Sequence, residues 1–171
     1  ICLGTMTFGN QTDEAEAHPQ MDAALEVGMT FMDCAEMYPV NPVRRETIGR
    51  SEEIIGSWLA KTGNRDAVEI ATKITGPSQM VRDGAPFDGK TVRAAIDASL
   101  KRLQTDRIDL YQLHWPVRGS YAFRQNWRYD PSGQDKAATL AHMEDVLGAM
   151  AEAVAAGKLR AVGLSNETAW G

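Results

Sequence analysis

Short apolar runs that suit β-strands alternate with helical patterns along the whole 171-residue sequence. The strand-like runs are residues 1–4, 30–33, 67–73, 107–115 and 159–166. Between them, apolar residues recur in steps of three and four, which is the spacing of an amphipathic helix. Two consecutive strands separated by a helix pair in parallel, because the helix carries the chain back to the starting edge. The pattern therefore predicts an α/β fold, with a parallel sheet of five strands and four helices outside it.

The helical patterns also predict where the helices begin and where they are buried. The clearest amphipathic stripe lies between residues 92 and 103. Another apolar stripe, from Leu140 to Val154, predicts a buried helix face that Gly157 closes as a cap. Pro19 must lie near the start of the first helix, because a proline further inside removes a backbone hydrogen bond. No linker or low-complexity segment interrupts the series, so residues 1–171 are predicted to form a single domain.

Polar side chains stand at the ends of four predicted strands. In chain order they are Asp33, Lys73, His114 and the pair formed by Ser165 and Asn166. The carboxyl ends of parallel strands lie at one edge of a sheet, where α/β proteins place their sites. Tyr38 comes five residues after Asp33, within reach of the same place. A carboxylate, an ammonium group, a phenol and an imidazole are therefore expected to share one cleft.

Such a cluster is suited to protonating an oxygen atom while a carbonyl group is reduced. A free tyrosine has a pKa of about 10, and a neighbouring ammonium group lowers that value. We expect Lys73 to lower the pKa of Tyr38 toward neutrality and Asp33 to keep Lys73 charged. His114 would donate a hydrogen bond that orients the carbonyl group. Positioned acid catalysis of this kind contributes about 10²- to 10⁴-fold in rate.

A reduction also needs a hydride donor, and no side chain in the cluster supplies one. Ser165 and Asn166 are candidates to hold a nicotinamide carboxamide, although both residue types are also good helix caps. No G-x-G-x-x-G motif follows a strand, so the sequence lacks the Rossmann fingerprint.

The composition is that of an ordinary soluble domain, with 43% hydrophobic and 24% charged residues. A net charge of -5 gives no general attraction to nucleic acid or anionic membranes. No apolar run approaches the roughly 18 residues of a membrane span, and no signal peptide is visible. The three histidines are scattered and the cysteines Cys2 and Cys34 are too few for a disulfide framework, so no metal site is expected. We expect both cysteines to be buried, reduced thiols and the protein to be cytoplasmic.

Two loops are longer than a compact fold requires, residues 39–50 and 116–138. The second loop is predicted to be either a substrate lid or a mobile surface loop. It holds aromatic and basic side chains, namely Tyr121, Phe123, Trp127, Tyr129, Arg118, Arg124 and Arg128. A surface for single-stranded nucleic acid is a poor alternative, because the chain as a whole is acidic.

Several segments resemble the aldo-keto reductases in order and spacing: LGTMTFG, DCAEMY, ATK, DLYQLHWP and GKLRAVGLSNET. The segments AEMYPV, SLKRLQTD and LSNETAWG look especially like the bacterial Tas-type branch. The resemblance covers essentially the whole chain. The family's catalytic tetrad falls on Asp33, Tyr38, Lys73 and His114, with all four residue types retained.

The resemblance implies a (β/α)8 barrel and NADPH-dependent reduction of aldehydes or ketones to alcohols. Tyr38 would be the general acid, Lys73 and Asp33 would tune it, and His114 would orient the carbonyl beside Trp115. The family positions that contact the nicotinamide fall on Gly4, Thr5, Met6, Asp33, Ser165 and Asn166. A barrel of this kind takes about 250 residues, so we expect only the first five βα units, the N-terminal part of a barrel.

Three alternatives stay open. Asp33 and Lys73 could form a structural ion pair at a barrel rim, with no catalytic role. Lys73 could act as the nucleophile of a Schiff-base aldolase. The chain could also be a non-catalytic binding or regulatory subunit, as some proteins resembling this family are. The substrate, beyond a small carbonyl compound, and the oligomeric state are not predicted.

Overall fold

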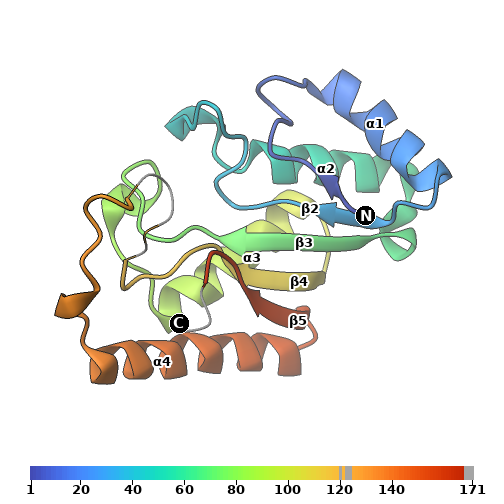
Figure 1. The fold of residues 1–171 in the computed structure, drawn as a ribbon. Helices are drawn as coiled ribbons and strands as arrows, with labels where there is room; N and C mark the ends of the chain where they lie inside the picture. The colour runs from blue at the N-terminus through green and yellow to red at the C-terminus, as the bar shows by residue number, and fades with distance from the viewer. Residues whose placement is uncertain (120, 122–124, 168–171) are drawn as a thin grey trace.

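The computed structural model describes residues 1–119, 121 and 125–167. Five strands and four α-helices alternate over this part of the chain, as the sequence predicts (Figure 1). The strands are β1 (Leu3–Gly4), β2 (Phe31–Asp33), β3 (Glu69–Ile74), β4 (Ile108–Leu113) and β5 (Leu159–Leu164). The helices are α1 (Glu14–Glu26), α2 (Arg50–Thr62), α3 (Gly89–Leu103) and α4 (Lys136–Ala155).

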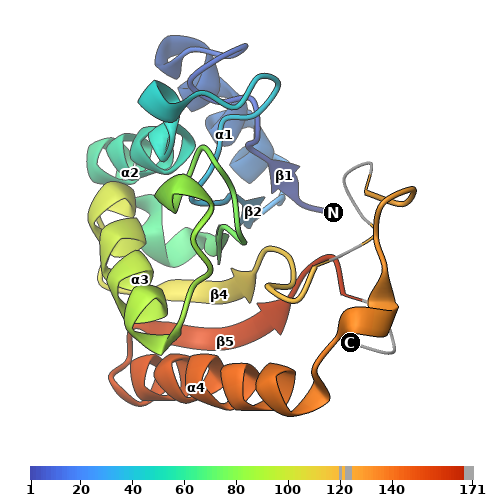
Figure 2. The same cartoon turned by 90° about the vertical axis from the view of Figure 1, so that its left-hand side faces the viewer.

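The strands form one parallel sheet in the order β1-β2-β3-β4-β5. The register places Asp33 opposite Ala71, and Lys73 opposite Gln112. Because side chains two residues apart share a face of a strand, Asp33 and Lys73 point to the same side of the sheet. The helices cover the other side (Figure 2). A sequentially ordered parallel sheet with helices on its outside is part of a (β/α) barrel wall, with five of the eight strands present.

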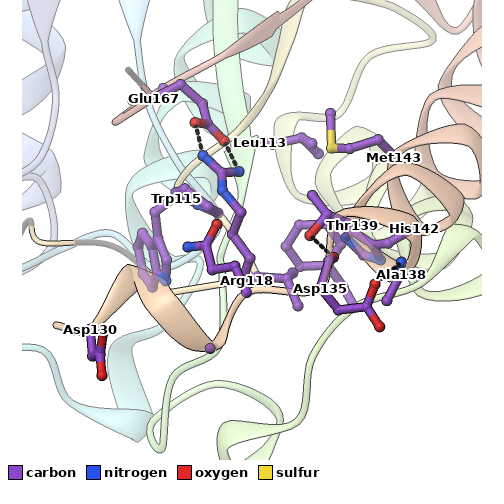
Figure 3. A pocket seen from close by; sticks show the side chains of 16 residues that line it. Leu113, Trp115, Arg118, Asp130, Asp135, Ala138, Thr139, His142, Met143 and Glu167 are labelled. Carbon is purple, nitrogen blue, oxygen red and sulfur yellow. Dashed lines mark hydrogen bonds and ion pairs between the residues drawn. The ribbon is translucent and has the colours of Figure 1, made fainter. Parts of the chain in front are cut away.

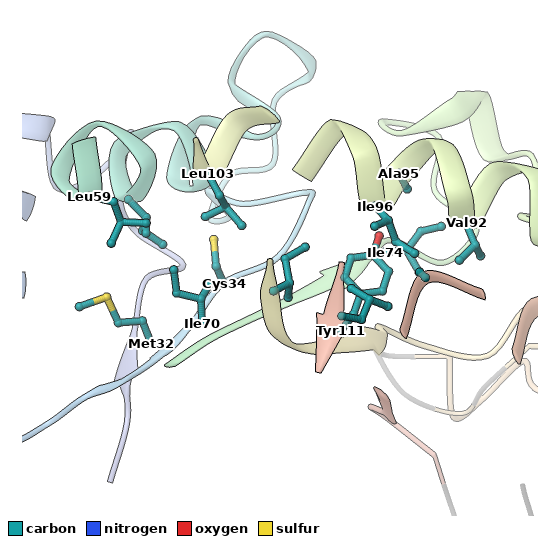
Figure 4. Packing of buried hydrophobic residues seen from close by; sticks show 14 of the residues in the cluster. Met32, Cys34, Leu59, Ile70, Ile74, Val92, Ala95, Ile96, Leu103 and Tyr111 are labelled. Carbon is teal, nitrogen blue, oxygen red and sulfur yellow. The ribbon is translucent and has the colours of Figure 1, made fainter. Parts of the chain in front are cut away.

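The hydrophobic core lies between the sheet and its helices (Figure 4). Met32, Ile70 and Tyr111 contribute from the strands, and all three are fully buried. Ile96 and Leu103 of α3 pack against this face. The alternation of side chains therefore sends Met32, Ile70 and Tyr111 outward to the helices, whereas Asp33 and Lys73 point to the inner face.

The first helix begins earlier than the position of Pro19 predicts. Asp13 caps α1, its side chain accepts a hydrogen bond from the N–H of Glu16, and the Glu16 side chain accepts one from the N–H of Asp13. This capping box satisfies the first backbone donors and fixes the start at Glu14. Pro19 consequently lies inside the helix rather than near its start.

The apolar stripe of α4 is only partly buried, so the prediction of a buried 140–154 face was wrong in part. Met150 is fully buried, whereas Leu140, Leu147 and Val154 are 40–58% exposed. The face that packs on α3 and β5 is made by Val146, Ala149, Met150 and Ala153. Small alanines allow α4 to approach its neighbours closely, which turns the larger leucines away from them.

The two cysteines differ in exposure. Cys34 is buried, and burial together with the negative charge of Glu52 raises its pKa to about 12. Cys2 is exposed because it precedes β1, so the prediction of a buried thiol was wrong for this residue. Among the described helices, none is both long enough and apolar enough to cross a membrane.

Candidate active site

The centre of the site is an ion pair between the ends of two neighbouring strands. Asp33 is the last residue of β2, and Lys73 is the last but one of β3. The Lys73 ammonium nitrogen donates to the two Asp33 carboxylate oxygens at 2.7 and 2.8 Å and to the Cys34 carbonyl oxygen at 2.7 Å. Lys73 is only 6% exposed. These contacts engage all three ammonium donors, which opposes the Schiff-base alternative, because a nucleophilic amine needs a free lone pair.

Tyr38 approaches this pair from the loop that follows β2. Its ring centroid lies 5.3 Å from the Lys73 ammonium nitrogen. The loop is held by backbone hydrogen bonds, since the Tyr38 carbonyl accepts from the N–H groups of Gly49 and Ser51, where α2 begins. Tyr38 therefore lies close to Lys73 and its partner Asp33, as the sequence predicts, although Asp33 and Lys73 are not among the residues that line the cavity beside Tyr38.

His114 completes the group from the neighbouring strand. It follows β4 directly, and its backbone N–H donates to the carbonyl oxygen of Ile74, the last residue of β3. The His114 ring contacts the Tyr38 ring edge-on, with ring centroids 5.7 Å apart. It also packs in a tilted arrangement on the Trp115 ring, with centroids 4.9 Å apart. Burial, together with the nearby Lys73 charge, lowers the pKa of His114 to about 3. The imidazole is therefore neutral at physiological pH and carries one N–H that can donate to a carbonyl oxygen.

The protonation of Tyr38 differs from the sequence expectation. Burial is the main cause that raises its pKa to about 12, and the negative charge of Asp33 adds to it. Lys73 does not lower the pKa as expected, because its charge is neutralised by Asp33, which lies beside the same ring. The phenol consequently carries its proton throughout the neutral range. It is suited to giving that proton to a base stronger than itself, such as a developing alkoxide.

A cavity of about 700 Å³ opens beside Tyr38 and His114. Besides Tyr38 and His114, its lining combines apolar side chains with three uncharged polar ones, Asn41, Ser78 and Gln125. The lining residues are Met6, Met37, Tyr38, Val40, Asn41, Val43, Pro77, Ser78, His114, Trp115, Pro116, Val117, Gly119 and Gln125. None of these carries an ionised side chain. Both long loops predicted from the sequence contribute to this cavity.

Gly4, Thr5 and Met6, three of the residues expected at a nicotinamide, lie around the same group. Thr5 is buried, and its hydroxyl and N–H both donate to the Asp33 carbonyl at 2.9 and 3.0 Å. Gly4 pairs with Asp33 in the sheet, and a Cβ atom at Gly4 would meet nothing within 4 Å, so open space lies beside the ion pair. Met6 is 39% exposed and lines the cavity.

Ser165 and Asn166 follow β5 and lie next to His114. The Asn166 side-chain amide donates to the His114 carbonyl at 2.7 Å and to the Ser165 hydroxyl oxygen at 3.2 Å. These bonds fix which way the amide points and leave its oxygen and the Ser165 hydroxyl hydrogen for a ligand. One acceptor and one donor match the NH₂ and C=O groups of a carboxamide. Asn166 has a left-handed backbone, with φ of 56°, which is unusual for a residue other than glycine.

Sequence reasoning missed Glu36 and Arg82, which tie the loop of Tyr38 to the end of β3. The Arg82 guanidinium donates to both Glu36 carboxylate oxygens, at 2.8 and 3.0 Å. Glu36 lies inside the quoted DCAEMY segment, so an acidic residue buried among apolar neighbours was the available signal.

Trp115 also lines a second cavity, of about 390 Å³ (Figure 3). Trp115, Pro116 and Val117 line both cavities. Arg118 and Glu167 form a bidentate ion pair in its wall, with N–O distances of 2.8 and 2.5 Å. The lining of the second cavity includes Ser165, whereas Tyr38 and His114 line the larger one, and neither lining includes Asp33 or Lys73.

The loop over residues 116–138 is described in part. Trp127 and Tyr121 are exposed, whereas Tyr129 accepts a hydrogen bond from Gln134. Phe123 and Arg124 lie outside the described residues. Within the described part of the chain, no three His, Cys, Asp or Glu side chains group in a way that could hold a metal ion.

Comparisons with known proteins give one consistent result. The family model of the Aldo/keto reductase family matches residues 1–171. "Protein tas" of Escherichia coli K12 is 48% identical over 173 residues, covering 99% of this chain and 49% of that protein. "Norsolorinic acid reductase stcV" of Emericella nidulans is 31% identical over 183 residues, covering 99% of this chain and 40% of the other. The similarity to the Tas-type branch that the sequence motifs predict is confirmed.

A solved structure shows the same fold. The holo form of aldo-keto reductase AKR11C1 from Bacillus halodurans superposes with a TM-score of 0.67 and 29% sequence identity. The match covers 96% of this chain and 45% of that one. The chain thus spans about half the length of the proteins it matches, which agrees with a partial barrel.

Proposed function

Because the chain belongs to the aldo/keto reductase family, we propose that it reduces aldehydes or ketones to alcohols with NADPH, using Tyr38 as the general acid. Reduction of carbonyl groups in general is supported by the family and by the named reductase relatives. The observation that carries the finer proposal is the convergence of Tyr38, His114 and the Asp33–Lys73 pair beside one apolar cavity.

The residues present fit a nicotinamide ring. Gly4 leaves room beside Asp33, and the free donor and acceptor on Ser165 and Asn166 match a carboxamide. When bound, the reduced nicotinamide supplies the hydride. We propose that Ser165 and Asn166 fix the plane of the ring against the inner face of the sheet. The preference for NADPH over NADH is proposed from family membership.

The chain's own groups handle the carbonyl oxygen. The neutral imidazole of His114 donates its N–H and fixes the carbonyl in the cavity. Negative charge grows on the oxygen during reduction, and the Tyr38 phenol then transfers its proton to that oxygen. The raised pKa of Tyr38 does not prevent this step, because an alkoxide is a stronger base than a phenolate. The Lys73 ammonium nitrogen lies 5.3 Å from the centroid of the Tyr38 ring, where it attracts the face of the ring.

The cavity also indicates a class of substrate. Its lining is mostly apolar and includes no ionised side chain, so burying a charged substrate there would cost its hydration without a partner. We propose that uncharged aromatic or aliphatic carbonyl compounds are the substrates. The amides of Asn41 and Gln125 offer hydrogen bonds to a polar group on the substrate.

The test is NADPH oxidation, followed by absorbance, with an aromatic aldehyde such as 4-nitrobenzaldehyde. The assay is made on the 171-residue chain and on any longer reading frame that encodes it. Tyr38→Phe should lower kcat by about 10²- to 10⁴-fold, as expected when a positioned acid is removed. Tyr129→Phe is the matched control, because that phenol lies outside the cavity.

Each outcome has a defined meaning. Turnover that Tyr38→Phe abolishes and Tyr129→Phe preserves would support the proposal. Turnover that persists in Tyr38→Phe would contradict the assigned acid. Absence of turnover in both chain lengths would favour the non-catalytic alternative.

A further inference from the structure

Glu36 connects the loop of Tyr38 to the end of the strand that carries Lys73. Its N–H donates to the Lys73 carbonyl at 3.0 Å. Its carboxylate accepts a hydrogen bond from the N–H of Thr75 at 2.8 Å. Glu36 is only 8% exposed. A single residue, two positions before Tyr38, is therefore bonded on both its backbone and its side chain to residues that flank the site.

Arg82 contacts both Glu36 and Thr75. Its guanidinium donates to both carboxylate oxygens of Glu36 and also to the carbonyl oxygen of Thr75. Glu36, Thr75 and Arg82 thus contact one another pairwise. One terminal nitrogen of Arg82 contacts both Glu36 oxygens while the other contacts Thr75, and such a pair with little solvent exposure restricts both partners more than an exposed pair does.

The backbone at Arg82 is unusual for a non-glycine residue. Arg82 and Asp83 have φ values of 56° and 53°, both in the left-handed region. Such conformations are unfavourable for residues with a Cβ atom and persist where the surroundings hold them in place. The side chain of Arg82 leaves this left-handed turn and contacts Glu36, so the turn and the ion pair occur together.

We propose that Glu36 and Arg82 are positioning residues that fix Tyr38 relative to Lys73 and His114. Neither side chain lines the cavity beside Tyr38, so the pair acts through the loop rather than by touching the substrate. The inference rests on the proposed function for its catalytic meaning. Its structural part, that the pair holds Tyr38 in place, stands independently of which reaction the site performs.

The first readout is the fluorine NMR spectrum of the chain labelled with 3-fluorotyrosine. The sequence has four tyrosines, and Tyr38→Phe assigns the signal of Tyr38. Glu36→Gln and Arg82→Gln should shift or broaden this signal while those of Tyr121 and Tyr129 stay in place; Tyr111 interacts with the charges of both side chains and does not serve as a reference. Arg45→Gln is the matched control, because Arg45 joins the same two loops through Asp83 and the Gln79 carbonyl, at an exposed position.

The second readout is the split between kcat and KM for an aromatic aldehyde. Displacing a catalytic group by about 1 Å can cost about 10²-fold in rate, so kcat should fall by tens of fold in both variants. KM should change less than kcat, since the cavity lining is intact. Arg82→Lys keeps a positive charge beside Glu36 and should recover part of kcat.

The outcomes separate this inference from the proposed function. A Tyr38 signal that moves in Glu36→Gln and Arg82→Gln but not in Arg45→Gln supports positioning, even if the wild-type chain shows no turnover. An unmoved Tyr38 signal overturns the inference, whether or not activity falls. If one of the two glutamine variants fails to fold, the other decides, and an unmoved Tyr38 signal in that folded variant also overturns the inference.

Discussion

The Lys73 ammonium group lies within hydrogen-bonding distance of both carboxylate oxygens of Asp33, at 2.7 and 2.8 Å. The two side chains are unequal in exposure, because the Lys73 side chain is 7% exposed and that of Asp33 is 31% exposed. The buried charge of Lys73 is therefore balanced mainly by Asp33, whereas the charge of Asp33 is also solvated by water. Changes at Asp33 should consequently affect stability and chemistry together.

Asp33→Asn should destabilise the fold. The substitution leaves the Lys73 charge buried with only neutral oxygens around it, which we expect to lower the free energy of unfolding by about 2 kcal/mol. Urea denaturation followed by circular dichroism measures the difference. Asp97→Asn is the control, because Asp97 pairs with Lys158 at an exposed position, where an ion pair contributes at most about 1 kcal/mol. Equal effects of the two substitutions would show that Lys73 does not depend on Asp33.

The pH profile of reduction should be flat from about pH 6 to pH 9. Burial and Asp33 raise the pKa of Tyr38 to about 12, so the phenol keeps its proton across this range. A tyrosine with a pKa near 7 would instead lose its acid form, and the rate would fall about tenfold per pH unit above neutrality. The measurement is kcat/KM against pH in a buffer of constant ionic strength. A decline that begins near pH 7 would restore the sequence expectation that Lys73 lowers this pKa.

The sequence predicts the positions of the site residues better than it predicts their electrostatics. Asp33, Lys73 and His114 could be placed because the carboxyl ends of neighbouring parallel strands lie at one edge of the sheet. The pKa of Tyr38 could not, because it depends on how much of the charge of Lys73 is cancelled by Asp33 and on how deeply the ring is buried. Those quantities come from packing across several loops.

Helix boundaries and long-range polar contacts show the same limit. Pro19 alone predicts that α1 begins close to this residue, but the capping box at Asp13 determines where the helix begins. The exposed leucines of α4 carry the correct periodicity, yet the alanine face packs more closely on α3. Arg82 lies 46 residues from Glu36, so no local pattern could have joined them.

The stability of the fold should fall in acid because of His114. The unfolded histidine binds a proton near pH 6.5, whereas burial, with a further contribution from Lys73, lowers the folded pKa to about 3. Between these values the unfolded state holds more protons, so the free energy of unfolding falls as pH decreases, by up to about 4 kcal/mol from this residue. His114→Gln should flatten the curve of unfolding free energy between pH 3 and 6.5. A variant with the same slope as the wild type would contradict the lowered pKa.

Gly76→Ala should displace Trp115. A Cβ atom at Gly76 would lie 2.2 Å from the indole nitrogen of Trp115, and the rigid indole must then move as a whole. Overpacking of this kind costs about 1–3 kcal/mol, and the moved indole should raise KM for bulky aldehydes more than for small ones. Tryptophan fluorescence and KM for two aldehydes of different size measure the effect. Gly148→Ala meets nothing within 4 Å and should leave KM unchanged; equal KM values for the two variants would mean that Trp115 does not shape the cavity.

The absence of ionised side chains from the lining of the larger cavity should set a preference among substrates. We expect kcat/KM for 4-methylbenzaldehyde to exceed that for 4-carboxybenzaldehyde by at least about tenfold, because the carboxylate loses its hydration without gaining a cationic partner. The two aldehydes are similar in size, so charge is the main difference between them. Val117→Arg adds a cation to the lining. It should raise kcat/KM for 4-carboxybenzaldehyde and so reduce the ratio of the two kcat/KM values. A ratio near one in the wild type would show that the charged end of the substrate stays in water, outside the cavity.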